Sequence, residues 1–405
     1  MRKAPAYLSV AVVVLLVTLA VVVAIDSSHT SRTKRAPVAG TVVSGTDTIA
    51  AVARVGPTSF VNAGPFGVGE TTLRLSYDGA PVEVWYPATP ASVRGRPSQT
   101  YDVAHWLPQS LKRLLPLGSA VTFPSGGVRG VAVSSGRFPL VVFCHGYSGF
   151  RDQSTFLTSR LASWGFIVAA PDLLDYDLTA VLSGKVAPSS SADIAEVKST
   201  LALMSKENSA PRSRFSAHLD MGKVAVIGHS LGGSLAEEVA SVDPQVRTFI
   251  GMAGASVGAL AAKSAGPVGT PAAEPGMLMV GTADHVVKPA LILRAFDAMS
   301  PPKRLVTLKG AGHLAFSDIC LLGSGQGGLL GIAERVHITI PPQLVPLASD
   351  GCQPEDLPIK VGWQVIRQAV TAQLRYALGF DHTQAGFNGL GHAFKGAVAS
   401  DTFVP

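Results

Sequence analysis

The segment VAVIGHSLGGSLAEEVA, residues 224–240, constrains the fold more than any other part of the chain. Its first half is rich in β-branched residues, as in a buried strand, and its second half favours a helix. At the junction, Gly228, Ser230 and Gly232 form a G-x-S-x-G pattern, which is typical of a tight strand-to-helix turn that presents a nucleophilic serine. Side chains at the two glycine positions would collide with neighbouring backbone. The segment therefore predicts a strand, a strained turn and a helix, with the Ser230 hydroxyl above the edge of a sheet.

Short hydrophobic runs alternate with helical segments between residues 70 and 380. Five further runs match buried strands: LVVFCHG (140–146), FIVAAPD (166–172), FIGMAG (249–254), GMLMVGTAD (276–284) and KRLVTLKGAGH (303–313). This alternation indicates βαβ units, and so an α/β fold with a mostly parallel central sheet flanked by helices. Residues 73–88 instead indicate an antiparallel hairpin with Asp78 and Gly79 at its turn, which we expect at the N-terminal edge of the sheet.

Two further side chains complete a candidate catalytic set. A serine hydroxyl is a weak nucleophile and needs a base, and the base needs an orienting carboxylate. Asp284 ends one predicted strand and His313 follows the next, so the parallel sheet should bring both to Ser230, in the expected order Ser, Asp, His. His285 is adjacent to the proposed acid and should point elsewhere, and His229 inside the turn is interpreted as a packing or hydrogen-bonding residue.

The same chemistry needs N–H donors for the negative charge that develops on the substrate oxygen. We expect these donors at the backbone of Leu231, directly after the serine, and of Tyr147, in the loop HGYSG. The Tyr147 ring is expected to border the acyl site. The sequence has no H-E-x-x-H, P-loop or G-x-G-x-x-G pattern in a suitable context, so we expect neither a metal nor another cofactor.

Charge and cysteine content bear on partners and compartment. Residues 1–35 contain five Lys or Arg and one acid, so only +2 of the formal net charge of +6 falls on the rest of the chain. A nearly neutral body gives no support for a nucleic-acid partner. Cys144 lies in a predicted central strand, where a lone cysteine is a small buried hydrophobe. Cys320 and Cys352 lie in a loop-rich segment and form the expected disulfide of an exported protein.

The predicted domain organisation has four parts. Residues 1–25 are a signal peptide or an N-terminal membrane anchor, because residues 4–25 carry no charge and would span roughly 33 Å as a helix. Residues 26–68 are expected to form a tether, residues 69–380 the catalytic domain, and residues 381–405 a flexible tail. Both interpretations of the N-terminus place the catalytic domain outside the cytoplasm, and an anchor would also hold it at a membrane.

Six motifs together resemble the α/β-hydrolase superfamily: VEVWYPA (82–88), FCHGYSG (143–149), LASWGFIVAAPD (161–172), GHSLGG (228–233), GTADHVVKP (281–289) and GAGH (310–313). They are most similar to the platelet-activating-factor-acetylhydrolase and dienelactone-hydrolase-like branch, with cutinase-type polyester hydrolases as more distant relatives. The resemblance covers about residues 70–380. It implies ester hydrolysis through an acyl-enzyme, with Ser230, Asp284 and His313 in the triad positions. Dienelactone hydrolases proper use a cysteine nucleophile, so Ser230 argues against that reaction.

Two insertions, near residues 101–130 and 317–357, depart from the family pattern. Within the first, residues 101–118 indicate an amphipathic helix that is either a lipid-facing lid or packed on the core. The apolar side chains of both insertions favour a hydrocarbon-binding pocket if they line it. The sequence thus predicts a secreted or membrane-anchored serine ester hydrolase acting on lipid-like or short-to-medium acyl esters. The alternatives are a peptidase or acyltransferase with the same triad, and a catalytically silent binding protein of the cell envelope.

Overall fold

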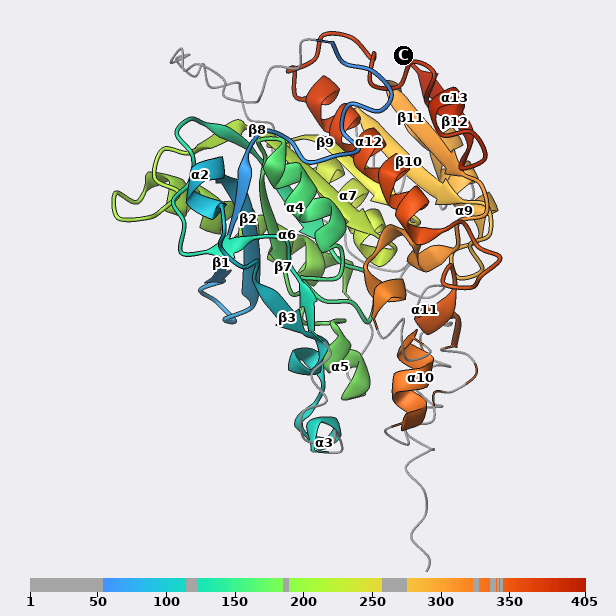
Figure 1. The fold of residues 1–405 in the computed structure, drawn as a ribbon, viewed down its shortest axis with the longest axis horizontal. Coiled ribbons are helices and arrows are strands. Elements are labelled where there is room, and N and C mark those ends of the chain that lie inside the picture. Colours follow the sequence, from blue (N-terminus) through green and yellow to red (C-terminus); the bar gives the residue numbers. More distant parts are fainter. Residues whose placement is uncertain are drawn as a thin grey trace, which may run out of the picture.

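The computed structural model describes residues 54–113, 122–184, 189–256, 275–322, 328–335, 340, 342 and 345–405. Within them lie a ten-stranded sheet and a separate two-stranded sheet, with helices on both sides of the large one (Figure 1). The strands are β1 (Gly67–Arg74), β2 (Pro81–Ala88), β3 (Thr100–Asp102), β4 (Thr122–Pro124), β5 (Val128–Arg129), β6 (Phe138–Cys144), β7 (Ile167–Pro171), β8 (Leu219–His229), β9 (Val246–Met252), β10 (Gly276–Gly281), β11 (Lys303–Leu308) and β12 (Val398–Val404). The α-helices are α2 (Pro90–Val93), α3 (Gln109–Lys112), α4 (Thr155–Ser163), α5 (Leu178–Leu182), α6 (Ser190–Ser209), α7 (Leu231–Val242), α9 (Pro289–Ala298), α10 (Gly328–Arg335), α11 (Val345–Ser349), α12 (Ile359–Ala377) and α13 (Leu390–Ala393), and the 3-10 helices are η1 (Val103–Trp106), η2 (His313–Phe316) and η3 (Ile319–Leu321).

The large sheet has the order β12-β11-β10-β9-β8-β6-β7-β2-β1-β5. Between β11 and β7 along this order, every pair of adjacent strands is parallel. The antiparallel β1–β2 hairpin, with Arg74 opposite Pro81, joins the sheet beside β7. Gly79 has a φ of 78° in its turn, a left-handed conformation that glycine adopts without a Cβ penalty. The predicted fold class and its antiparallel N-terminal edge are confirmed.

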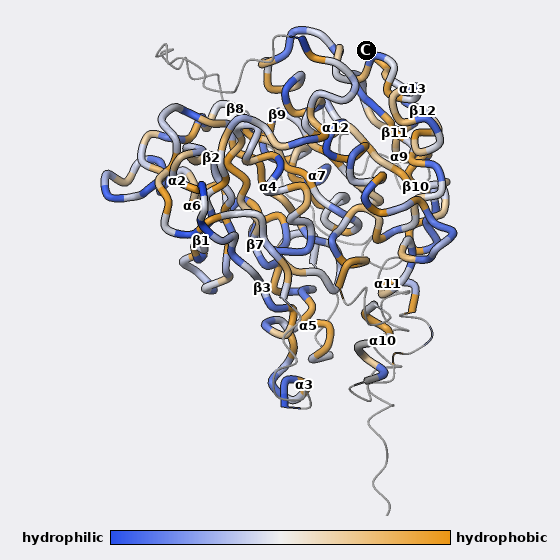
Figure 2. Tube along the Cα trace, in the orientation of Figure 1, coloured by the Kyte–Doolittle hydropathy of each residue, from blue (hydrophilic) through white to orange (hydrophobic). Residues whose placement is uncertain are grey.

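Hydrophobic residues run along the central strands (Figure 2), and alternate side chains of each strand point to opposite faces of the sheet. On one face Val141, Phe143 and Ile227 pack under α4 and α12. On the other face Val142 and Val226 pack under α6, α7 and α9. Because both faces are covered, the central strands are apolar throughout, as parallel strands in α/β proteins usually are. The helices cover the faces of the sheet and not its edge, so a site can form where the carboxyl ends of the parallel strands meet.

The first insertion does not form the single amphipathic helix expected over residues 101–118. It consists of β3, η1 and α3, with residues 114–118 outside the described part of the chain. The break lies at Leu107 and Pro108: proline disfavours helical backbone at the residue before it, and Leu107 is extended. Asp102 accepts the N–H of Ala104 and starts a separate 3-10 turn.

The two insertions contribute to one apolar cluster, built on Tyr101, Trp106, Phe150 and Leu322. Trp106 is only 2% exposed and stacks on Phe150 with ring centroids 4.5 Å apart. Its Nε1–H donates to the carboxylate of Asp172, just after β7. Trp106 therefore anchors the insertion to the domain, which favours the core-packed alternative for this residue over the lipid-facing one.

The expectation of a flexible tail over residues 381–405 is wrong. Phe387, Leu390 and Phe394 are buried in the core beside α12, and β12 pairs antiparallel with β11. The prediction overweighted the glycines of this segment. At Gly386 the missing side chain allows close packing instead, since a Cβ there would lie 2.7 Å from the Cβ of Ala372. The tail is part of the domain.

The predicted boundary between tether and domain at residue 69 is also too late. The side chain of Phe60 is fully buried, and its backbone N–H donates to Oε1 of Gln368 in α12 at 2.8 Å. Trp164 donates its indole N–H to the carbonyl of Asn62. The domain thus includes residues from the mid-fifties onward, whereas the predicted anchor or signal at 1–25 and the tether up to residue 53 lie outside the described residues. Among the helices that the structure does describe, none has the length and hydropathy to cross a membrane.

Candidate active site

Ser230 occupies the sharp turn between β8 and α7 with φ 56° and ψ −123°, a strained conformation for a residue with a side chain. Its N–H donates to the carbonyl of Met252 at the end of β9, which fixes the turn to the neighbouring strand. A Cβ on Gly228 would lie 2.2 Å from the carbonyl oxygen of Gly232, and one on Gly232 would lie 2.2 Å from that of Cys144. Both flanking positions therefore require glycine, as the sequence pattern predicts.

The structure brings Ser230, His313 and Asp284 together in a chain of hydrogen bonds. His313 Nε2 lies 2.9 Å from Ser230 Oγ, and His313 Nδ1 lies 2.9 Å from Asp284 Oδ2. The second carboxylate oxygen of Asp284 accepts the N–H groups of Val286 and Val287 at 2.9 and 2.8 Å. Asp284 and His313 are each 2% exposed, so the acid is held by directional donors and shielded from solvent. This arrangement can take a proton from the Ser230 hydroxyl.

Two backbone N–H groups near the serine are available as donors. Neither the N–H of Tyr147 nor that of Leu231 has a hydrogen-bond acceptor among the described residues. The loop that carries Tyr147 approaches closely, since a Cβ on Gly146 would lie 3.0 Å from the Cβ of Ser230. Ser148, with φ 60°, donates its N–H to the carbonyl of Tyr176 and holds this loop in place. The two predicted donors thus flank the serine, Tyr147 on a loop and Leu231 as the first residue of α7.

Comparisons with known proteins identify the fold and the broad class of this chain. A family model described as Chlorophyllase matches residues 130–251, which include Ser230. Platelet-activating factor acetylhydrolase of Cavia porcellus is 22% identical over 355 residues, covering 71% of this chain and 75% of that protein. A ferulic acid esterase from Streptomyces cinnamoneus shares the fold with a TM-score of 0.54, at 22% identity over 80% of this chain and 93% of that one. The chain is an α/β-hydrolase. The resemblance found in the sequence is therefore confirmed.

His229, which the sequence analysis interpreted as a packing or hydrogen-bonding residue of this α/β-hydrolase, connects three parts of the site. Its Nε2 lies 3.0 Å from the carbonyl oxygen of His313, and its Nδ1 lies 3.1 Å from Nε2 of Gln153. Burial lowers the pKa of His229 well below its ordinary value, and the nearby His313 adds to this shift. The ring is therefore neutral at neutral pH: Nε2–H donates to His313, and Nδ1 accepts from Gln153. Sequence reasoning missed Gln153, because no local pattern marks it.

His285 does point away from the catalytic set, as predicted. Its side chain is 68% exposed and its Nδ1 lies 2.7 Å from Oδ1 of Asp350. Asp350 also accepts the backbone N–H of His313 at 2.7 Å. The sequence analysis did not single out Asp350, which belongs to the second insertion.

The three cysteines of the α/β-hydrolase divide into a pair and a single residue. Cys320 and Cys352 are joined by a disulfide, so the bridge links η3, which follows the His313 segment, to the residues after α11. Cys144 is buried at the end of β6, and burial raises the pKa of its thiol. The bridge closes the second insertion next to the segment that carries His313.

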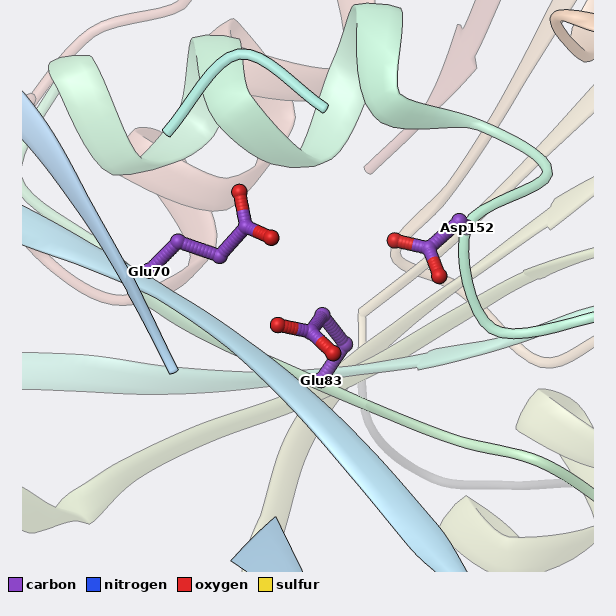
Figure 3. Close-up of side chains that lie close together, drawn as sticks. All are labelled: Glu70, Glu83 and Asp152. Carbon is purple, nitrogen blue, oxygen red and sulfur yellow. The ribbon is translucent and has the colours of Figure 1, made fainter. Parts of the chain in front are cut away.

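A second group of buried carboxylates is called the acid cluster here: Glu70, Glu83 and Asp152 (Figure 3). Their oxygens lie within 4.8 Å of one another, near enough to hold one metal ion. However, Arg129 lies 2.8 Å from Glu83 and 3.4 Å from Glu70, and Arg151 lies 3.5 Å from Glu83 and 3.6 Å from Asp152. We interpret the acid cluster as a charge-balanced structural group, since two guanidinium groups already pair with it.

Protonation adds to this balance of charge. Burial, with Glu83 as the second cause, raises the pKa of Glu70 from 4.5 to about 7. The same two causes raise the pKa of Asp152 well above its ordinary value. The hydroxyl of Ser125 hydrogen-bonds to Glu70, and Thr72 donates to Glu83 at 2.8 Å. The acid cluster therefore holds protons at pH values where ordinary carboxylates have lost them.

Proposed function

We propose that this α/β-hydrolase is a serine-dependent carboxylic ester hydrolase. The observation that carries the proposal is the chain of hydrogen bonds from Asp284 through His313 to the strained Ser230. The names of the two relatives, an acetylhydrolase and an esterase, support the same class of reaction.

In the proposed mechanism, Ser230 Oγ attacks the carbonyl carbon of the ester while its proton passes to His313 Nε2. Asp284 keeps the imidazole in the tautomer that accepts this proton and stabilises the imidazolium that forms. The N–H groups of Leu231 and Tyr147 donate to the negatively charged oxygen of the tetrahedral intermediate. His313 then gives the proton to the leaving alcohol. Water, activated by the same imidazole, releases the acid from the acyl-enzyme.

We further propose that the acyl group is lipid-like or of short to medium length. The partly buried side chains of Tyr147 and Leu231 flank the serine, and the apolar cluster around Trp106 joins the two insertions nearby. Each acyl methylene buried against such a surface is worth about 0.8 kcal/mol, roughly a fourfold gain in kcat/KM. A hydrocarbon chain should therefore be preferred to a charged acyl group.

The proposed compartment is outside the cytoplasm. The disulfide between Cys320 and Cys352 supports this, because such bonds persist in oxidising environments. Whether residues 4–25 anchor the domain in a membrane or are cleaved is open to direct test, by sequencing the N-terminus of exported material.

Two assays on the purified protein test the proposal. A fluorophosphonate probe should label Ser230, and p-nitrophenyl butyrate to octanoate should be cleaved faster than the acetate. Peptide substrates should show negligible turnover, since amide cleavage must also protonate a poor leaving group. Absence of labelling would favour a catalytically silent binding protein. Values of kcat/KM that fall steadily from acetate to octanoate would contradict the apolar acyl site.

A further inference from the structure

The carboxylate of Asp350 touches both loops that carry the proposed base and acid. Its Oδ2 accepts the backbone N–H of His313 at 2.7 Å and that of His285, the residue after Asp284, at 3.2 Å. Its Oδ1 lies 2.7 Å from the Nδ1 of His285. One side chain from the second insertion thus joins the loop after β10 to the loop after β11.

Asp350 is itself held firmly in place. Its N–H donates to the carbonyl of Pro346 at 2.9 Å, and its own carbonyl accepts the N–H of Leu314 at 2.8 Å. The adjacent backbone is tightly packed, since a Cβ on Gly312 would lie 2.4 Å from the nitrogen of Gly351. The disulfide at Cys352 fixes the same segment two residues further on. The carboxylate therefore acts from a rigid support.

We propose that Asp350 is a positioning residue that fixes the loop of His313 relative to the loop of Asp284. This inference rests on the proposed function. The two catalytic side chains stand on separate loops, and their 2.9 Å hydrogen bond requires those loops to stay aligned. Asp350 accepts the backbone N–H of His313, while Nε2 of His229 lies 3.0 Å from the carbonyl oxygen of His313. The backbone of the base is thus fixed on both sides of its Cα.

Two substitutions of Asp350 can separate the role of its hydrogen bonds from the role of its charge. In Asp350→Asn, the amide oxygen can accept both backbone N–H groups and the amide nitrogen can donate to His285 Nδ1. In Asp350→Ala, all of these bonds are lost. If Asp350 acts by holding the two loops, Asp350→Asn should keep most of the kcat that Asp350→Ala loses.

The test measures kcat, KM and the thermal midpoint on p-nitrophenyl butyrate for wild type, Asp350→Ala and Asp350→Asn. Asp356→Ala is the matched control, because Asp356 lies in the same segment and accepts only a local N–H, that of Gln353, among the described residues. We expect Asp350→Ala to lower kcat by about 10- to 100-fold with KM nearly unchanged, because a shift of about 1 Å in a catalytic group has effects of this size. The kcat of Asp350→Asn should lie within about threefold of the wild-type value, and the kcat of Asp356→Ala should equal it.

Each remaining outcome has a defined meaning. A wild-type kcat in Asp350→Ala, or an Asp350→Asn variant as slow as Asp350→Ala, would overturn the positioning role. If Asp350→Ala does not fold, Asp350→Ser supplies the same comparison, because its shorter side chain cannot reach both loops. If wild type itself cleaves no ester, the proposed function fails, independently of Asp350.

Discussion

The proposed catalytic site and the acid cluster are two buried groups of polar side chains that stabilise carboxylates in different ways. In the catalytic site, the single carboxylate of Asp284 accepts one imidazole N–H and two backbone N–H groups. In the acid cluster, three carboxylates face one another and are balanced by Arg129, Arg151 and bound protons. Directional neutral donors leave the charge of Asp284 available to the adjacent ring. Ion pairs and protonation neutralise the charge of the acid cluster, which fits our interpretation of it as a structural group.

The comparison predicts that changes in the catalytic site remove activity and spare stability. Ser230→Ala should lower kcat by roughly 10⁵- to 10⁶-fold, because no other group can form the acyl-enzyme. The thermal midpoint should stay within a few degrees of wild type, since the Ser230 hydroxyl bonds only to His313 among the described residues. Ester hydrolysis and circular dichroism melting measure the two effects. Near-normal turnover in the folded variant would exclude Ser230 as the nucleophile.

A smaller loss of activity is expected when the carboxylate of Asp284 becomes an amide. Asp284→Asn should lower kcat by roughly 10³- to 10⁴-fold, because an amide cannot hold the imidazole in the required tautomer or stabilise the imidazolium. The amide oxygen can still accept the N–H groups of Val286 and Val287, so little stability should be lost. The same assays apply. A variant that loses its fold together with its activity would show that Asp284 is as structural as the acid cluster.

The smallest effect is expected in the acid cluster and should appear only in stability. The folded-state pKa of Glu70 lies near 7, above the value of 4.5 of the unfolded chain, so the folded protein binds this proton more tightly. Stability should therefore fall as the pH rises from 4.5 through 7, by up to about 3 kcal/mol. Glu70→Gln imitates the protonated side chain and should abolish this loss, which makes it more stable than wild type at pH 8.

Urea unfolding at pH 5 and pH 8 measures this difference, with the exposed Glu355 changed to Gln as a control for loss of one negative charge. Activity of Glu70→Gln should stay at the wild-type level. If Glu70→Gln and wild type differ by the same free energy of unfolding at both pH values, the raised pKa of Glu70 is not coupled to folding.

The sequence predicts the catalytic set better than it predicts the groups that support it. The sequence could predict that Ser230, Asp284 and His313 lie together, because a local motif marks the first and a parallel sheet brings the strand ends of the others to the same edge. Gln153 and Asp350 could not, because their contacts depend on how an irregular loop and an insertion pack on the domain. No spacing rule relates such segments to a strand end.

The errors in the fold have a related cause. The single helix expected over residues 101–118 is broken at Pro108, and Trp106 packs on Phe150 and donates to Asp172 instead. The segment after residue 380 contains many glycines, and its composition gave no sign that three large apolar residues would be buried beside α12. In both segments, contacts with distant parts of the chain determined the structure, and the local sequence did not show them.

The position of β12 at the edge of the large sheet has a consequence for biosynthesis. A nascent chain that emerges from the N-terminus completes β11 before α12, α13 and β12 have been made, so one side of β11 has no partner for the duration of that synthesis. An unpaired, apolar strand edge is a template for aggregation with other chains. When β12 arrives, its Asp401 pairs with Arg304 of β11, and β12, in which only Val398 is buried, becomes the new edge. The final strand thus acts as a built-in protection that becomes available only after nearly the whole domain has been synthesised.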